Sequence, residues 1–222
     1  LLSALPLKRI EAPADKPIEV LENALRWPRL DSKDERALLS ERLQNLSLSQ
    51  TALIDFLNVA EAGPSSFMER HLLHIPKPRS AEGSYGTAIH AALETAQRLI
   101  NTSKLDPDTV LDRFESALMQ EHMAPLDYNR FKARGMELLP RLLGKDGIRL
   151  VKHALAEQRI SDISLGEARI GGKIDSIDPT EGMLVISDYK TGKALNSFET
   201  KNQTKLVKAW RHRNQLLFYA IL

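Results

Sequence analysis

The stretch SLGEARIGGKIDSIDPTEGMLVISDYK, residues 164–190, predicts a β-hairpin that carries charged residues among apolar ones. Both arms are rich in β-branched residues, and the turn residues DPTEG join them. Asp188 and Lys190 lie two positions apart, so their side chains leave an extended strand on the same face. Because a buried charge is costly unless it is paired or holds a metal, these residues either lie in water at the strand's end or form a site.

Asp175, on the first arm, is a candidate partner for Asp188. A turn between Asp178 and Met183 sets Asp175 opposite about Ile186, one diagonal step from Asp188 and on the same face. Two converging carboxylates repel each other unless a cation lies between them, and Mg²⁺ and Mn²⁺ favour carboxylate oxygens. Lys190 adds a positive charge that can orient an attacking water or offset charge on a phosphate. The hairpin therefore predicts a divalent-metal site on strands 168–177 and 183–190.

Helices are predicted on both sides of the hairpin, and the segment HALAEQRI predicts one more strand before it. The order of elements is helices, an antiparallel meander and a final helix, which is typical of the α+β class. The predicted helices begin at Ser49 (SQTALIDFLN) and cover residues 84–100, 107–121, 126–143, with a bend or break at Pro140, and 204–222.

The composition excludes several classes of protein. Of 222 residues, 42% are hydrophobic and 27% are charged, which is typical of a globular protein, and no apolar run reaches the roughly 18–20 residues that span a bilayer. The chain has no cysteine, so it has no disulfide, iron–sulfur cluster or cysteine zinc site. We expect a cytoplasmic protein.

Residues 1–46 predict a linker or helical appendage of a preceding domain, with one helix after Ser32, because Ser32 and Glu35 have capping-box spacing. Residues 47–222 predict the main domain. The chain does not begin with Met, and it stops at Leu222 inside a helical pattern. We therefore expect a fragment of a longer polypeptide.

Two helices carry polar residues at regular spacing. Gly86, His90 and Glu94 are four residues apart and share one face, where Gly86 leaves room for a strand or ligand to approach. In the last helix Arg211, Gln215 and Tyr219 share a face. The opposite face is expected to be buried, through Leu206, Trp210, Leu217 and Ile221. The basic residues of this region attract a phosphate backbone without reading sequence: Lys201, Lys205, Lys208, Arg211 and Arg213.

The segments GGKIDSID, VISDYKTGK and QLLFY, with YGTAIHAALE upstream, resemble the PD-(D/E)XK nuclease superfamily in its RecB-like branch. The resemblance runs from about residue 49 to the C-terminus. The opening segment LSLSQTALIDFL also resembles nuclease domains attached to UvrD-like superfamily 1 helicases. The resemblance implies a restriction-endonuclease-like core, with a small mixed or antiparallel sheet flanked by helices.

The same resemblance implies roles for particular residues. His90, Asp175, Asp188 and the backbone carbonyl of Tyr189 would bind Mg²⁺ or Mn²⁺, and Lys190 would be the catalytic lysine. Gln215 and Tyr219 match the Q-x-x-x-Y element near the DNA backbone and the site, and Glu157 matches a recurrent acidic position.

The resemblance implies a metal-dependent DNA nuclease, which we expect to act on single-stranded DNA generated by an attached helicase in DNA repair or recombination. Any helicase motor is expected outside this chain, since AEGSYGTA lacks the preceding strand and the G-K-[ST] ending of an ATP site. Two alternatives remain open. One is a catalytically silent domain that binds DNA or docks a helicase. The other is a metal-dependent phosphohydrolase with another substrate, RNA included.

Overall fold

The chain divides into two units between Asn45 and Leu46. In the first unit, α2 (Ser32–Gln44) is the helix predicted after Ser32. The remainder of the predicted appendage, residues 1–31, lies outside the described part. The computed structural model describes residues 32–59, 63–102, 104–144, 147–180, 182–195, 197, 199 and 201–222.

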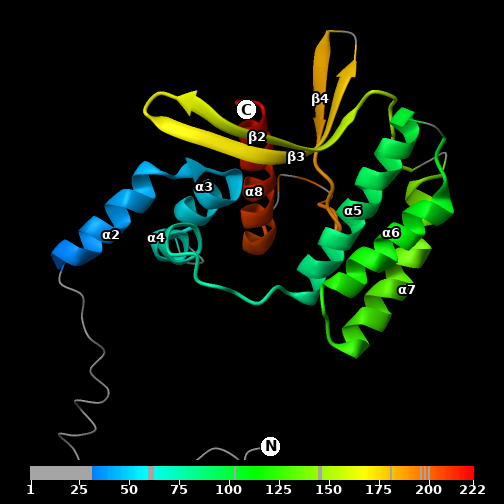
Figure 1. Ribbon diagram of the computed structural model, residues 1–222, viewed down its shortest axis with the longest axis horizontal. Coiled ribbons are helices and arrows are strands. Elements are labelled where there is room, and N and C mark those ends of the chain that lie inside the picture. Colours follow the sequence, from blue (N-terminus) through cyan, green and yellow to red (C-terminus); the bar gives the residue numbers. More distant parts are fainter. Residues whose placement is uncertain are drawn as a thin grey trace, which may run out of the picture. The chain divides into compact units, whose positions relative to one another are not determined.

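Three helices of the second unit, Leu46–Leu222, lie side by side: α5 (Ala81–Thr102), α6 (Pro107–Gln120) and α7 (Pro125–Leu142) (Figure 1). Asp106 caps α6 as predicted, since its side chain accepts the backbone N–H of Thr109. Pro140 lies inside α7 without ending it. These helices bury one core, whose largest side chains are Tyr85, Ile89, Leu93, Phe114, Leu118, Phe131 and Leu139.

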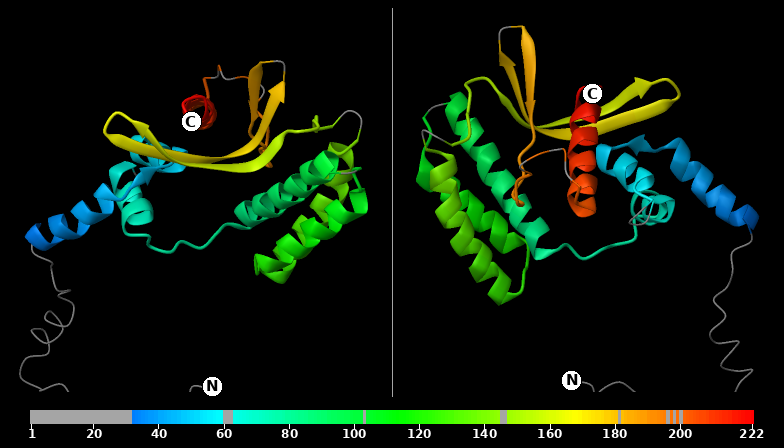
Figure 2. Two further views of the ribbon diagram at one scale, coloured as in Figure 1. Left: turned by 45° about the horizontal axis from the view of Figure 1, so that its top comes forward. Right: turned by 180° about the vertical axis from the view of Figure 1, so that it is seen from behind.

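The sheet is built around β3 (Ala168–Thr180), a central strand 13 residues long. β2 (Leu155–Leu165) pairs antiparallel with one edge. On the other edge, β1 (Ser47–Leu48) pairs in parallel near the start of β3, and β4 (Met183–Ser187) pairs antiparallel near its end. Figure 2 shows β2 and β3 as a long curved ribbon whose far end carries β4. The predicted meander is confirmed, and β1 adds a parallel strand too short for its periodicity to be seen in sequence.

The structure corrects two details of the hairpin. β4 ends at Ser187, so Asp188 and Lys190 lie beyond the strand and not within it. The turn falls between Thr180 and Met183, and Ile186 pairs with Ile177. β3 is longer than predicted because it pairs with β4 as far as Thr180. Pro179 is tolerated there because the pairing of β3 with β2 has already ended at Ile177. The register is therefore displaced by two residues, and an even displacement keeps each side chain on its predicted face.

The remaining helices of this unit are α3 (Gln50–Leu57), α4 (Gly63–Phe67), the π-helix η2 (Met68–Leu72) and α8 (Gln203–Tyr219). Ser49 caps α3 as predicted, with its side chain accepting the backbone N–H of Ala52. α8 packs on β3 through a second core formed by Ile170, Ile174, Phe218 and Tyr219. Within the described residues, none of the helices has the length and apolar content to cross a membrane.

The predicted buried face of α8 is wrong. Trp210, Leu217 and Ile221 are 37%, 54% and 53% exposed, whereas Ala209, Phe218 and Tyr219 are buried. The helix is rotated because Phe218 and Tyr219 pack on β3 while Gln215 faces the loop after β4, where its amide donates to Asp188. A mixed sheet flanked by helices, as in a restriction-endonuclease-like fold, is the observed architecture.

Gly135 of α7 offers a test of the helical core. A methyl group at this position would overlap the ring of Phe114, which is 0% exposed. Alanine usually stabilises a helix interior by about 1 kcal/mol relative to glycine. Here overpacking outweighs that gain, and we expect Gly135→Ala to lower the free energy of unfolding by about 1–3 kcal/mol. Urea unfolding followed by circular dichroism measures the change.

Gly83→Ala, on an exposed position of α5, is the matched control. The nearest atom to its new methyl group would be the Ser80 hydroxyl oxygen at 3.4 Å, so no destabilisation is expected. Equal stability of the two variants would contradict the packing of Phe114 against Gly135.

Candidate functional site

Acidic side chains and one histidine meet at the middle of β3. Asp175 of β3 is 8% exposed, and its neighbours come from β2, α5, α8 and the loop after β4. The residues brought together from these elements are Glu157, His90, Gln215 with Tyr219, and Asp188 with Lys190.

His90, Glu157 and Asp175 form the tightest cluster. The Nδ1 atom of His90 lies 3.0 Å from Oε1 of Glu157 and 3.5 Å from Oδ1 of Asp175. One ligand atom from each residue lies within 4.8 Å of the others, as in a group that can hold a metal ion. Nitrogen and carboxylate oxygen donors without a thiolate suit a hard divalent cation. The donor chemistry therefore fits the cation that the sequence predicts.

Glu157 reaches this cluster through an unusual backbone conformation. Its φ is 50°, in the left-handed region, although it lies inside a strand. The flanking pairs of the ladder, Ala156 with Ser176 and Gln158 with Ile174, set Glu157 opposite Asp175. Such a conformation costs of order 1–3 kcal/mol and persists only where surrounding contacts hold it. Lys173 supplies one of these contacts, through a salt bridge to Glu157.

The segment after β4 is held by a hydrogen bond rather than by strand pairing. The backbone N–H of Tyr189 donates to Oδ2 of Asp175 at 2.6 Å. On either side of Tyr189, Asp188 and Lys190 contact each other, with Nζ of Lys190 2.5 Å from Oδ2 of Asp188. The two residues therefore meet as a pair, although their predicted place within a strand is wrong.

α8 satisfies the other oxygen of Asp188. The Gln215 amide donates to Oδ1 of Asp188 at 2.7 Å and to the Tyr219 hydroxyl at 2.9 Å. The Q-x-x-x-Y spacing thus places both residues on the helix face that meets the acidic site. Asp188 also interacts electrostatically with His90 and Asp175.

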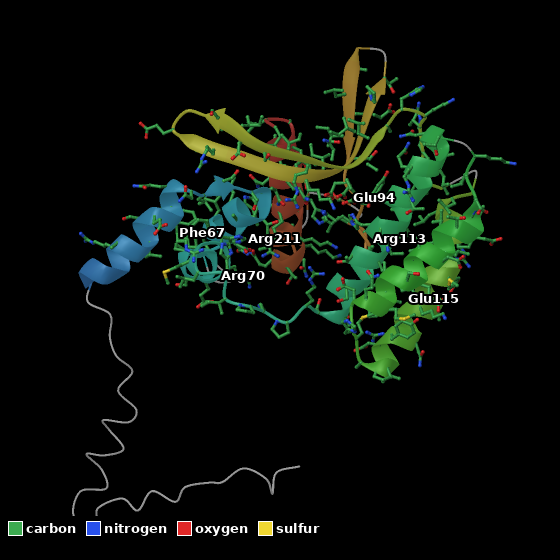
Figure 3. The ribbon with its side chains drawn as sticks, in the orientation of Figure 1. Phe67, Arg70, Glu94, Arg113, Glu115 and Arg211 are labelled. Carbon is green, nitrogen blue, oxygen red and sulfur yellow. The ribbon has the colours of Figure 1, made fainter. Side chains whose placement is uncertain are left out.

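The other predicted residues lie around this centre. A Cβ at Gly86 would lie 3.4 Å from Oγ1 of Thr191, so Gly86 admits the loop that follows Lys190. Glu94 is exposed, one turn beyond His90 on α5 (Figure 3). Arg211 lies on α8 (Figure 3), and its Nε atom is buried, so this part of the side chain faces protein.

Burial and mutual contacts shift the pKa values of the clustered side chains. The hydrogen bond to Glu157 raises the pKa of His90, against the opposing effect of burial. Burial tends to raise the pKa of Glu157, but hydrogen bonds from His90 and Lys173 outweigh it, and the net shift is downward. Burial raises the pKa of Asp175. These shifts favour the charged forms of His90 and Glu157, and a metal ion bound to His90 would have to displace the imidazole's proton.

Sequence reasoning missed Lys173, which pairs with Glu157. Lys173 stands two positions before Asp175 in GGKIDSID, so the period of a strand puts the two on one face. The sequence could therefore have predicted that Lys173 lies near Asp175. It could not predict the contact with Glu157, because that depends on the register of β2 against β3.

Comparison with known proteins gives one match. A family model described as the PD-(D/E)XK nuclease superfamily matches residues 47–222. The searches of curated proteins and of solved structures found no match. The matched segment contains the sheet, the acidic cluster and α8, and the superfamily consists of nucleases and related hydrolases that use divalent metals. The chain belongs to the PD-(D/E)XK nuclease superfamily.

Proposed function

We propose that residues 47–222 form a metal-dependent DNA nuclease domain of the RecB-like branch. The observation that carries this proposal is the cluster of His90, Glu157 and Asp175, with the Lys190–Asp188 pair held beside it by Tyr189 and Gln215. A cation-binding set next to an amine suits hydrolysis of a phosphodiester bond.

His90, Glu157 and Asp175 would hold Mg²⁺ or Mn²⁺, with Asp188 and the Tyr189 carbonyl as further ligands. A divalent ion bound there would lower the pKa of its bound water and neutralise charge on the scissile phosphate. Lys173 keeps Glu157 turned toward His90, which places the imidazole beside Asp175. This arrangement supports the assignment, because ligands held in advance lose little freedom on binding.

Lys190 would orient the attacking water and offset charge on the phosphate. Asp188 holds the Lys190 ammonium group, and Gln215 holds Asp188, so the amine has a defined position. Tyr219 accepts the second hydrogen of the Gln215 amide, which fixes that amide's orientation. The superfamily resemblance implies a product with a 5′-phosphate.

We propose single-stranded DNA as the substrate, produced by a helicase motor in the same longer polypeptide during repair or recombination. The resemblance of LSLSQTALIDFL to helicase-attached nuclease domains and the basic residues of α8 support this proposal. The cytoplasm would be its location.

Lys190→Ala is expected to lower the rate of DNA cleavage by at least about 100-fold, because the variant lacks the charge next to the reacting phosphate. Lys193→Ala, three residues further along the same loop and exposed, is the matched control and should cut at the wild-type rate. A gel assay with labelled single-stranded DNA and Mn²⁺ measures both. Equal rates for wild type and Lys190→Ala would disprove the role of this lysine.

Glu157→Gln is expected to weaken Mn²⁺ binding by about 10–100-fold, whether Glu157 acts as a ligand or only holds His90. The change is measured by the rise in melting temperature as Mn²⁺ is titrated, with Asp175→Asn as a second variant. Glu94→Gln, an exposed acidic residue on the same face of α5, is the control and should retain wild-type affinity. A wild-type protein with no Mn²⁺-dependent shift would instead favour a catalytically silent domain.

A competition assay tests the substrate class. Single-stranded DNA, duplex DNA and RNA of one sequence, each with its own label, are mixed with the protein and Mn²⁺. We expect single-stranded DNA to be cut fastest. Preferred cleavage of RNA would keep the phosphohydrolase mechanism and overturn the DNA assignment.

A further inference from the structure

One face of α8 continues from the site along the loop that carries Lys190. Lys208, His212, Gln215 and Tyr219 are spaced by four, three and four residues, so they form a single stripe on the helix. Gln215 bonds Asp188 at one end of the loop, and Lys208 donates to the Lys193 carbonyl at the other. The stripe therefore runs alongside the loop from Asp188 to Lys193.

His212 lies between these two anchors. Burial lowers the pKa of this imidazole, and the charges of Lys190 and Lys208 lower it further, against an opposing effect of Asp188. His212 is thus within electrostatic reach of the proposed catalytic lysine and of Lys208. Sequence reasoning assigned nothing to this histidine, because its neighbours come together only when α8 packs against the loop.

Lys208 is less exposed than Lys201, Lys205 and Arg213, the exposed basic residues of this region. Its side chain is half-buried and lies across the loop, with Nζ 3.9 Å from where a Cβ at Gly192 would be. An ammonium group has three donors, and the Lys193 carbonyl takes one. Among the residues that the structure describes, no carboxylate pairs with Lys208, so its charge is available to an anion.

We propose that Lys208 and His212 form a second phosphate subsite, which holds the phosphodiester next to the one that reacts. The proposal rests on the proposed function, since it places the strand along α8 as it leaves the acidic centre. Lys208 supplies a positive charge, and His212 supplies an N–H donor to a phosphate oxygen. Neither contact involves a base, so the subsite recognises the nucleic-acid backbone without regard to sequence.

Salt dependence of binding tests the charge of Lys208. The full chain is titrated with labelled single-stranded DNA in EDTA at pH 8 over a series of salt concentrations. Loss of one phosphate contact lowers the slope of log affinity against log salt by about 0.7 for a single strand. We expect this loss in Lys208→Ala, recovery in Lys208→Arg and a wild-type slope in Arg113→Ala, a change at an exposed position of α6. Equal losses in Lys208→Ala and Arg113→Ala would overturn the subsite in favour of diffuse attraction.

His212→Ala is expected to weaken the same binding several-fold with an unchanged slope. At pH 8 an imidazole with an ordinary pKa of about 6.5 is neutral, so its removal loses a donor but no charge. Wild-type affinity in His212→Ala would remove this residue from the subsite.

DNA with uncharged methylphosphonate linkages distinguishes a direct contact between Lys208 and a phosphate from a purely structural role of Lys208. Single methylphosphonate groups are placed at successive positions around the cut, and cleavage with Mn²⁺ is measured. In the wild-type protein one position beside the cut should be sensitive, and Lys208→Ala should lose sensitivity at that position alone. A uniform slowing of all substrates by Lys208→Ala would show that the lysine only supports the loop, and would overturn the proposal.

Failure of the subsite and failure of the nuclease assignment give different results. A wild-type protein that cuts normally, with wild-type DNA binding in Lys208→Ala, contradicts only the subsite. A wild-type protein that cuts no nucleic acid contradicts the proposed function, while a lower slope in Lys208→Ala would still support phosphate binding by this face.

Discussion

The hydrogen bond from the Tyr189 backbone to Asp175 is the constraint on which the site depends. Ladder pairing ends at Ser187, so the described residues that follow are not held by backbone pairing within the sheet. Asp175, buried on the central strand, needs donors for its oxygens, and Tyr189 supplies one at 2.6 Å. Because Asp188 and Lys190 flank Tyr189, this bond helps to bring both next to the carboxylate, together with the Gln215 bond to Asp188 and the packing of Tyr189.

Three carboxylates in so small a volume are tolerated only because each has positive or polar partners. Glu157 contacts His90 and Lys173, and Asp188 contacts Lys190 and Gln215. The left-handed backbone conformation at Glu157 accompanies this crowding, since it turns the Glu157 carboxylate toward His90 and Asp175. In a protein that needed only stability, such crowding would serve no purpose, because an apolar cluster of the same volume packs without a desolvation penalty.

The same elements build the cores and the site. Phe218 of α8 packs on β3, while Gln215 of the same helix bonds Asp188. Tyr189 packs against the core of α5, α6 and α7, and its backbone N–H serves Asp175. His90 projects from α5, whose other face is buried in that core. Close packing therefore sets the relative positions of the side chains, since a core at crystal-like density permits little adjustment.

The sequence by itself determined the features that depend on neighbours along the chain. The caps at Ser49 and Asp106, the hairpin, and the shared face of Gly86 and His90 follow from spacing and local chemistry. Asp188 and Lys190 do meet, but they lie beyond the strand, so the strand period that put them on one face does not explain their contact. The motif pattern was sufficient to predict the family that the match to residues 47–222 shows.

Only the tertiary structure decided which distant segments meet. Glu157 lies opposite Asp175 because of a strand register that no local period reports, and the hairpin turn falls where the pairing of β3 with β2 has ended. The rotation of α8 follows from the packing of Phe218 and Tyr219 on β3 and from the hydrogen bond of Gln215 with Asp188, 27 residues away. Together these outweigh the exposure of Leu217. Apolar periodicity records the average tendency to be buried, whereas the partner of a buried polar group is fixed only when the whole unit has folded.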